Sequence, residues 1–423
     1  MQWTQIYGGS GLDLAQNAMQ APDGGYIVCG ITYSADGDVV GGSGYADYWV
    51  IKLDASGTME WQKVLGGGAE DDSYTVAFTN DGGYIVGGQT LSVDGDVTGL
   101  HGNGNFPDAW VLKLTAAGQI EWQKAFGGSF SEGILNIIQT TDGGYIFTGA
   151  AFSSNGDVTS NHGEEDIWVV KISASGNLEW QKALGGSQYD IPGRVIEVDG
   201  GYMVSGSTNS NNGQITSNHG GYDYWLIKLD PSGNLLWQKT YGGSADDYCN
   251  GLSAIDGGYL LSGSSTSADG DISAALGGSD CWIVRVDEEG TMLWDKSVGT
   301  SGWESAVNAY EVADGFMIAG QGSFFQELGS DYYVVKLGQE ELGVAEMHKT
   351  VSVYPNPVSS ILNINSDETI SNISIYDMQG RSVLTKIQTE NTAKIDVSGL
   401  VPNIYIVEAI TPSGKQVARI IIE

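Results

Sequence analysis

One series of motifs recurs six times along the chain and limits the possible folds more than any other feature. With small variations, each unit contains a tryptophan segment, a Gly-Gly loop, an acid, an Asp-Gly-Gly-Tyr turn and an Asp-x-aromatic segment. A repeat of 57 to 61 residues is typical of a solenoid, a propeller or an array. The tryptophans that open the six units are Trp3, Trp61, Trp122, Trp180, Trp237 and Trp294.

Each unit has the strand pattern of one propeller blade. In the second unit the pattern predicts strands over 61–65, 73–79, a segment from 84 and 108–114, separated by turns such as Asp81-Gly82-Gly83. Adjacent glycines supply the positive φ angles that tight hairpins need. Four short antiparallel strands per unit predict an all-β protein, a six-bladed β-propeller over residues 1–337.

The two ends of the repeat region complement each other. The last unit stops after 331–337 without a tryptophan strand, and the chain opens with such a strand at 3–7. We therefore expect 3–7 to pair beside 331–337 and close the ring, which would leave no open sheet edge.

Charge excludes some partners. The 423-residue chain has 52 acidic and 18 basic residues, a net charge of −34. Eleven basic residues fall at two repeated framework positions, and Arg194 is the only other basic residue of the repeats. Without a basic patch we expect no nucleic-acid partner. The sequence has no run of 18 apolar residues, so we expect no membrane span.

The cysteines and the N-terminus also carry expectations. Cys29, Cys249 and Cys281 lie in apolar strand patterns, which favours small buried side chains over disulfides. The repeats start directly after Met1, so we interpret the chain as a mature form whose export signal has been removed.

A second domain follows the repeats. The composition shifts near residue 338, which predicts a linker over 338–349, and seven short strands over 350–423 indicate a small Ig-like β-sandwich. Its motifs include Tyr354-Pro355-Asn356-Pro357, Leu362-Asn363-Ile364, Ile375-Tyr376-Asp377 and Ile404-Tyr405-Ile406. This order resembles the C-terminal sorting domain of the type IX secretion system of Bacteroidota, and the repeats resemble propeller repeats of its cargo. The resemblance implies export by the type IX secretion machinery through residues 350–423, to the outer cell surface or the medium.

Two sets of acids are candidate cation ligands. One acid follows the Gly-Gly loop in every unit, and either these six acids line the mouth of the central channel or each binds backbone N–H groups of its own loop. The Asp-Gly-Asp loops could hold calcium, which takes six to eight oxygen ligands, although turn formation explains them more simply. No other cofactor is indicated. The candidate calcium ligands are Asp36, Asp38, Asp94, Asp96, Asp269 and Asp271.

The ligand-binding candidates are aromatic residues that break the repeat. The tryptophans of the Asp-x-Trp strands alternate with Val and Ile, which favours packing between blades. Aromatic residues in the long loops are not required by the fold, so they are the better candidates for stacking on a sugar. They are Tyr45, Phe106, Tyr222, Trp303, Phe324 and Phe325.

The sequence favours a secreted or cell-surface propeller that binds an extracellular ligand, a glycan or a protein, without catalysis. A polysaccharide-degrading enzyme is the first alternative, because 52 acids leave room for the two carboxylates that a glycosidase needs. Glu164-Glu165 is the acid pair that departs from the blade pattern. A protein-binding scaffold or adhesin component is the second alternative.

Overall fold

A computed structural model describes residues 3–42, 45–102, 104–323, 331–338, 351–355, 357–366, 369–377, 381–387, 389–411 and 414–422. The chain divides into two compact units, Met1–Leu337 and Gly338–Glu423. The expected linker, past Gly338, lies outside the described residues. Within the described ranges no helix is long and apolar enough to cross a bilayer.

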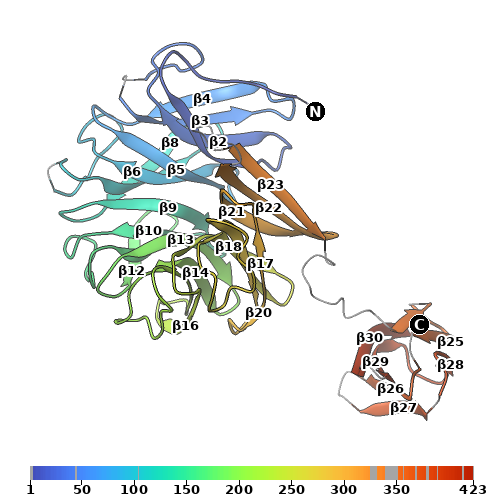
Figure 1. The fold of residues 1–423 in the computed structure, drawn as a ribbon. Coiled ribbons are helices and arrows are strands. Elements are labelled where there is room, and N and C mark those ends of the chain that lie inside the picture. The colour runs from blue at the N-terminus through green and yellow to red at the C-terminus, as the bar shows by residue number, and fades with distance from the viewer. Residues whose placement is uncertain are drawn as a thin grey trace. The chain divides into compact units, whose positions relative to one another are not determined.

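The first unit is a series of antiparallel sheets arranged around an axis (Figure 1). Five sheets of four strands are followed by β21-β22-β23, a sheet of three strands in the described part. The first strands pack against one another in sequence, which places them around the axis. These first strands are β1 (Asp13–Gln20), β5 (Asp71–Phe78), β9 (Glu132–Gln139), β13 (Asp190–Val198), β17 (Asp247–Ile255) and β21 (Trp303–Val312).

The other strands follow outward in chain order. The second strands are β2 (Tyr26–Thr32), β6 (Tyr84–Thr90), β10 (Tyr145–Ala151), β14 (Gly201–Thr208), β18 (Gly258–Ser265) and β22 (Gly315–Ser323). The third strands are β3 (Asp47–Leu53), β7 (Asp108–Leu114), β11 (Asp166–Ile172), β15 (Asp223–Leu229), β19 (Asp280–Val286) and β23 (Asp331–Gly338). The fourth strands are β4 (Met59–Leu65), β8 (Ile120–Phe126), β12 (Leu178–Leu184), β16 (Leu235–Tyr241) and β20 (Met292–Val298).

Aromatic side chains fill the space between neighbouring sheets. Trp110, Trp168, Trp225 and Trp282 of the third strands are fully buried, which confirms that the Asp-x-Trp positions serve packing. The indole of Trp110 also donates a hydrogen bond to Gln123 Oε1 on the fourth strand, at 2.7 Å. The three cysteines are free and buried, as expected. The result is the all-β, propeller-like unit that the repeats predict.

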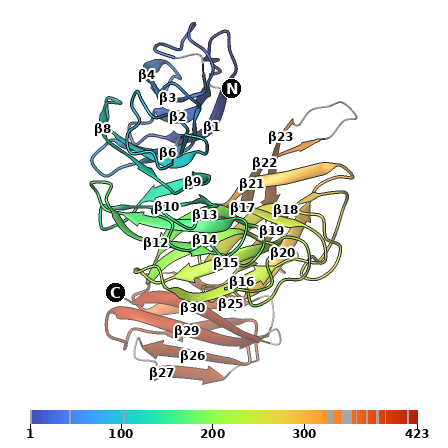
Figure 2. The ribbon, with the colours of Figure 1, turned by 90° about the vertical axis from the view of Figure 1, so that its left-hand side faces the viewer.

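The expected pairing of residues 3–7 with β23 is not found. Residues 3–7 form no strand, and β23 pairs with β22 alone in the described part. The N-terminal segment instead binds the first sheet: Trp3 Nε1 donates to Ala55 O at 3.1 Å, and Tyr7 donates its hydroxyl to Gly57 O. These local contacts form without β23, so the prediction was wrong in its pairing. Figure 2 shows β1–β4 and β21–β23 at the two ends of the series.

The second unit packs two sheets face to face. Its strands are β24 (Val351–Tyr354), β25 (Ile361–Ser366), β26 (Asn372–Asp377), β27 (Ser382–Ile387), β28 (Thr392–Asp396), β29 (Asn403–Thr411) and β30 (Gly414–Ile422). The sheets are β24-β25-β28 and β27-β26-β29-β30. Leu362, Ile364, Ile373, Ile375 and Val407 alternate inward and are at most 1% exposed, which is the pattern of a β-sandwich core.

Candidate functional site

The acid after each Gly-Gly loop binds its own loop. In the fourth sheet, Asp190 accepts the backbone N–H of Gly186 at 2.7 Å and the hydroxyl of Ser210 at 3.0 Å. The carboxylates of Asp13, Asp71, Glu132, Asp247 and Glu304 each accept a backbone N–H four residues earlier in the same way. The loop-binding interpretation of these six acids is therefore confirmed.

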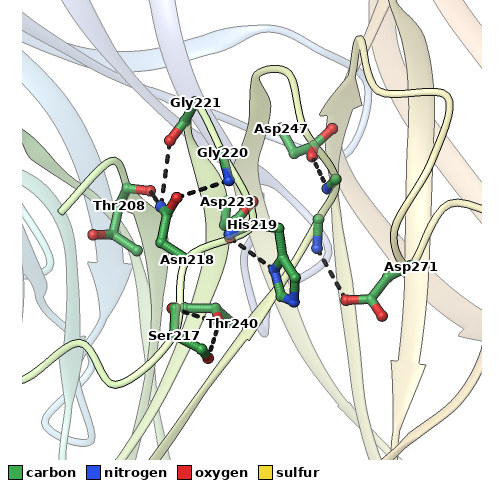
Figure 3. Close-up of polar contacts among 12 residues, drawn as sticks. Thr208, Ser217, Asn218, His219, Gly220, Gly221, Asp223, Thr240, Asp247 and Asp271 are labelled. Carbon is green, nitrogen blue, oxygen red and sulfur yellow. Dashed lines mark hydrogen bonds and ion pairs between the residues drawn. The ribbon is translucent and has the colours of Figure 1, made fainter. Parts of the chain in front are cut away.

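Buried carboxylates also meet in pairs between neighbouring sheets. A Cβ atom on Gly242 would lie 2.3 Å from Asp223 Oδ1 and 2.7 Å from Asp247 Oδ2, so only glycine fits between these side chains. Asp223 Oδ1 is buried without a hydrogen-bond partner. Its Oδ2 accepts the backbone N–H of His219 at 2.6 Å and lies 2.9 Å from His219 Nδ1 (Figure 3). Burial raises the pKa of Asp223 to about 6.

The Asp-Gly-Asp loops bind the neighbouring Gly-Gly loops. Asp36 Oδ1 accepts Ser10 N–H at 2.7 Å, and Asp94 and Asp269 make the same contact at 2.7 Å. The second acids Asp38, Asp96 and Asp271 each accept a glycine N–H. No group of three or more His, Cys, Asp or Glu side chains among the described residues has a metal-binding arrangement. Calcium binding by these six acids stays a prediction.

The candidate aromatic residues lie at separate junctions between sheets. Phe106 packs on Phe130 with ring centroids 5.5 Å apart, and Tyr222 packs on Tyr248 at 4.8 Å. Trp303 and Tyr45 are 41% and 59% exposed. Phe324 and Phe325 lie outside the described residues. The structure therefore does not gather the described four into one site.

The first strands carry the strongest departure from symmetry. Every one of them has a β-bulge, and the bulged strand residues differ from sheet to sheet. The bulge fits because the residue opposite is a glycine; a Cβ on Gly149, for example, would lie 1.8 Å from Gly133 O. Bulges re-aim side chains and are common beside active sites. The extra residues are Gln16, Tyr74, Leu135, Gly193 with Arg194, Asn250 and Val307.

A pocket of about 250 Å³ lies where three of these first strands begin. Tyr74 of β5, Leu135 of β9 and Pro192 of β13 line it, so it spans three neighbouring sheets at the channel mouth. Phe152 and Glu165, from the long loop between β10 and β11, line its other side. Leu135 and Phe152 are 45% and 37% exposed. The pocket thus combines aromatic walls with the carboxyl groups of Glu132 and Glu165, as ligand sites often combine apolar walls with a few polar groups. The Glu132 carboxylate is already bound by its own loop.

Glu165 is the chemically distinctive residue of this pocket. Its backbone is fixed, because its carbonyl oxygen accepts the N–H of Asp190 at 2.7 Å. Its carboxyl has no hydrogen-bond or ion-pair partner in the part of the chain that the structure describes. Burial, and then the neighbouring charge of Asp190, raise the pKa of Glu165 to about 7. A carboxyl with such a pKa in a pocket is a candidate functional group.

Asp72 is another acid that borders the same pocket. Asp72 Oδ2 accepts a hydrogen bond from Gln89 Nε2 at 3.1 Å and lies 3.4 Å from the Tyr74 hydroxyl, and both Gln89 and Tyr74 line the pocket. Among the candidate aromatic residues, Tyr222 is linked electrostatically to this pocket through Glu165. Burial raises the pKa of Tyr222 to about 12, and Tyr248 and Glu165 add to the rise. The sequence singled out Glu165 only as a break in the pattern and missed Tyr74, Leu135 and Phe152. The sequence feature that could have indicated Tyr74 and Leu135 is that one position of the first strand varies between otherwise similar units.

A comparison with known protein families identifies the second unit. Residues 352–423 match the family model of the secretion system C-terminal sorting domain. The chain is thus an exported propeller-like protein. It carries a type IX secretion sorting domain, which directs it out of the cell and to the cell surface.

Other proteins are similar to this chain over longer stretches. The regulatory protein FlaEY of Caulobacter vibrioides is 25% identical over 291 residues, which are 60% of this chain and 30% of FlaEY. The chain thus spans less than a third of that relative. PorZ, a surface component of the type IX secretion system of Porphyromonas gingivalis, is 12% identical with a TM-score of 0.39, covering 100% of this chain and 61% of PorZ. The α-L-arabinofuranosidase Arb93A of Fusarium graminearum is 11% identical with a TM-score of 0.43, covering 80% and 97% of the two chains.

Proposed function

We propose that this exported protein binds an extracellular ligand in the pocket at the channel mouth, and that the ligand is a glycan. The observation that carries the proposal is the pocket itself, lined by Tyr74, Phe152 and Glu165 from separate segments of the chain. Aromatic rings offer apolar faces to the C–H faces of a sugar, and the carboxyl and amide groups beside them can bind hydroxyls.

A glycan array with the full chain tests this proposal. Phe152→Ala removes one wall of the pocket, and we expect affinity to fall about tenfold or more, since truncating a central aromatic anchor often costs ~2 kcal/mol. Leu178→Ala is the matched control, because Leu178 begins the fourth strand β12, does not line the pocket and is exposed to a similar degree, 39% against 37%. Equal losses in both variants, or a wild-type protein that binds no glycan, would contradict the proposal.

A glycan-cleaving activity is the second candidate, and the Glu165 pKa of about 7 favours it. A general acid must be protonated near the working pH, and a second carboxylate must face it across the substrate. Asp72 is the acid next to the pocket that could fill that second role. Glu165→Gln should then abolish the release of reducing ends while binding persists. If the wild-type protein binds the glycan and releases no reducing ends, the cleavage activity is contradicted and only the binding function stands.

A further inference from the structure

Arg194 departs from the rest of the first strands in charge and in placement. It lies at the bulge of β13, two residues after Pro192 of the pocket, and the pairing of β13 with β14 skips both Gly193 and Arg194. The other five first strands place Gln16, Tyr74, Leu135, Asn250 and Val307 at their bulges. Arg194 is therefore the only charged residue among the bulge positions of the described strands.

The Arg194 side chain is half-buried, and its guanidinium has no hydrogen-bond or ion-pair partner in the described part of the chain. Its Nε atom is buried without a hydrogen bond, and the described part of the chain gives its side chain no ion pair. Burial lowers the pKa of Arg194. Charge interactions with Tyr310 of β21 and Cys249 of β17 act in the opposite direction. These neighbours lie on the first strands of the next two sheets, so the Arg194 side chain lies on the side of β13 that faces β17 and β21.

Other basic residues of the propeller show what a satisfied cation looks like here. Lys52 lies 2.9 Å from both Asp23 and Glu60, and Lys113 makes the equivalent pair of contacts. Arg285 also has a buried Nε, but its Nη2 donates to Asp256 O at 2.9 Å. Arg194 differs from them because its side chain has neither an acid nor such a backbone acceptor in the described part of the chain.

An unpaired cation with a buried nitrogen is costly, because burial removes water without supplying a counter-charge or an acceptor. Arginine keeps its proton at any physiological pH and presents up to five N–H donors in a plane, which suits the two oxygens of a carboxylate or the oxygens of a sulfate. We propose that Arg194 is an anion-recognition residue of the channel, and that it binds the carboxylate or sulfate group of an acidic oligosaccharide held in the neighbouring pocket. This inference deepens the proposed function and rests on it for the sugar part. The net charge of −34 favours a ligand with few acid groups over a polyanion.

Binding to matched sugars tests the specificity. The full chain is titrated with a uronic-acid disaccharide, a sulfated disaccharide and the neutral parent disaccharide. We expect one acidic form to bind at least tenfold more tightly than the neutral one, and Arg194→Gln to remove that preference while neutral binding stays. Lys124→Gln, which removes one positive charge from a fourth strand, should keep it. Equal affinity for all three sugars, or a preference that survives in Arg194→Gln, would overturn the assignment.

A direct readout separates this inference from the pocket. The chain has four arginines, so the Nε–H resonance of Arg194 can be assigned by its loss in Arg194→Lys. Titration with acetate or with sulfate alone should shift this resonance and leave that of Arg285 in place, and the two anions tell carboxylate from sulfate recognition. No shift with either anion sinks the proposal even if the pocket binds neutral glycans. A shift without glycan binding supports the anion site and sinks the proposed glycan function.

Discussion

The hydroxyl of Tyr48 donates a hydrogen bond to the carbonyl oxygen of Trp110 at 3.2 Å, across the junction between the first two sheets. Tyr224 makes the same contact to Trp282 at 2.9 Å. Tyr332 occupies the equivalent place in β23 but is 95% exposed, and Val334 is 64% exposed. On the first sheet, an apolar pocket of about 470 Å³ lined by Trp49, Ile51 and Ile6 has no covering sheet.

We expect Tyr332 to meet Trp49 when the ring closes, because so large an apolar surface is rarely left exposed. Tyr332→Ala should then lower the free energy of unfolding by about 2 kcal/mol or more, as core truncations do, and shift the thermal midpoint by a few degrees. The measurement is calorimetry beside Tyr48→Ala. A change within ~0.5 kcal/mol, the usual range for a surface substitution, would show that the two sheets stay apart. Light scattering tells closure from a second copy covering the surface.

The stability of the propeller should fall as the pH rises from about 4 to 7. Burial raises the pKa of Asp108, Asp190 and Asp223 to about 6, above the value of roughly 3.9 in an unfolded chain. The folded state therefore binds more protons in this window, and this part of its stability is lost as the pH passes through 6. Urea unfolding at a series of pH values measures the slope.

Asp223→Asn tests the cause of that slope. The amide removes the negative charge beside Asp247 while an oxygen still accepts the His219 N–H, so we expect higher stability at pH 7.5 and a flatter pH profile. Glu164→Gln removes one exposed charge and should leave the profile as it is. A profile unchanged by Asp223→Asn would mean that other groups set the slope.

The repeat pattern predicted the strands closely, and the reasons for the misses are physical. The strand that follows Asp81-Gly82-Gly83 and the strand that contains Trp61 are predicted by turn residues and alternation, which are local properties. The pocket depends on Tyr74, Leu135 and Pro192, which come from three sheets and meet only through packing. The bulge that turns Tyr74 and Arg194 out of the ladder needs a glycine on the partner strand, a pairing that one sequence does not reveal. The wrong pairing of residues 3–7 has a similar source, since the contact between Trp3 and Ala55 arises from packing that the repeat pattern does not show.

Export should depend on the second unit. Residues 352–423 form the sorting domain, with a core of its own that includes Leu362, Ile373 and Val407. Removal of residues 350–423 should leave the propeller folded inside the cell and absent from the surface and the medium. Immunoblots of cell fractions, with circular dichroism of the purified truncated chain, check both parts. Normal surface delivery of the truncated chain would refute the role of this domain.

Chelation of calcium should change the thermal midpoint little. In the third and fourth sheets, asparagine stands where the other loops have their first aspartate, and it makes the same contact. Asn155 Oδ1 accepts Ser129 N–H at 2.9 Å, and Asn212 Oδ1 accepts Ser187 N–H at 2.8 Å. A backbone N–H needs only an acceptor oxygen, which both side chains supply. Changing Asp36, Asp94 and Asp269 to Asn should therefore shift the midpoint by about one degree or less.

Calcium binding, the result that would contradict this prediction, should produce a large shift of the thermal midpoint. A ligand that binds only the folded state stabilises it by RT ln(1 + [L]/Kd), about 2.7 kcal/mol at 100 times Kd, which moves the midpoint by several degrees. A calcium-dependent rise that disappears when Asp36, Asp38, Asp94, Asp96, Asp269 and Asp271 are all changed to Asn would establish these loops as calcium sites. Their carboxylates would then exchange backbone N–H donors for the cation, and the loops beside the channel mouth would be ordered by calcium.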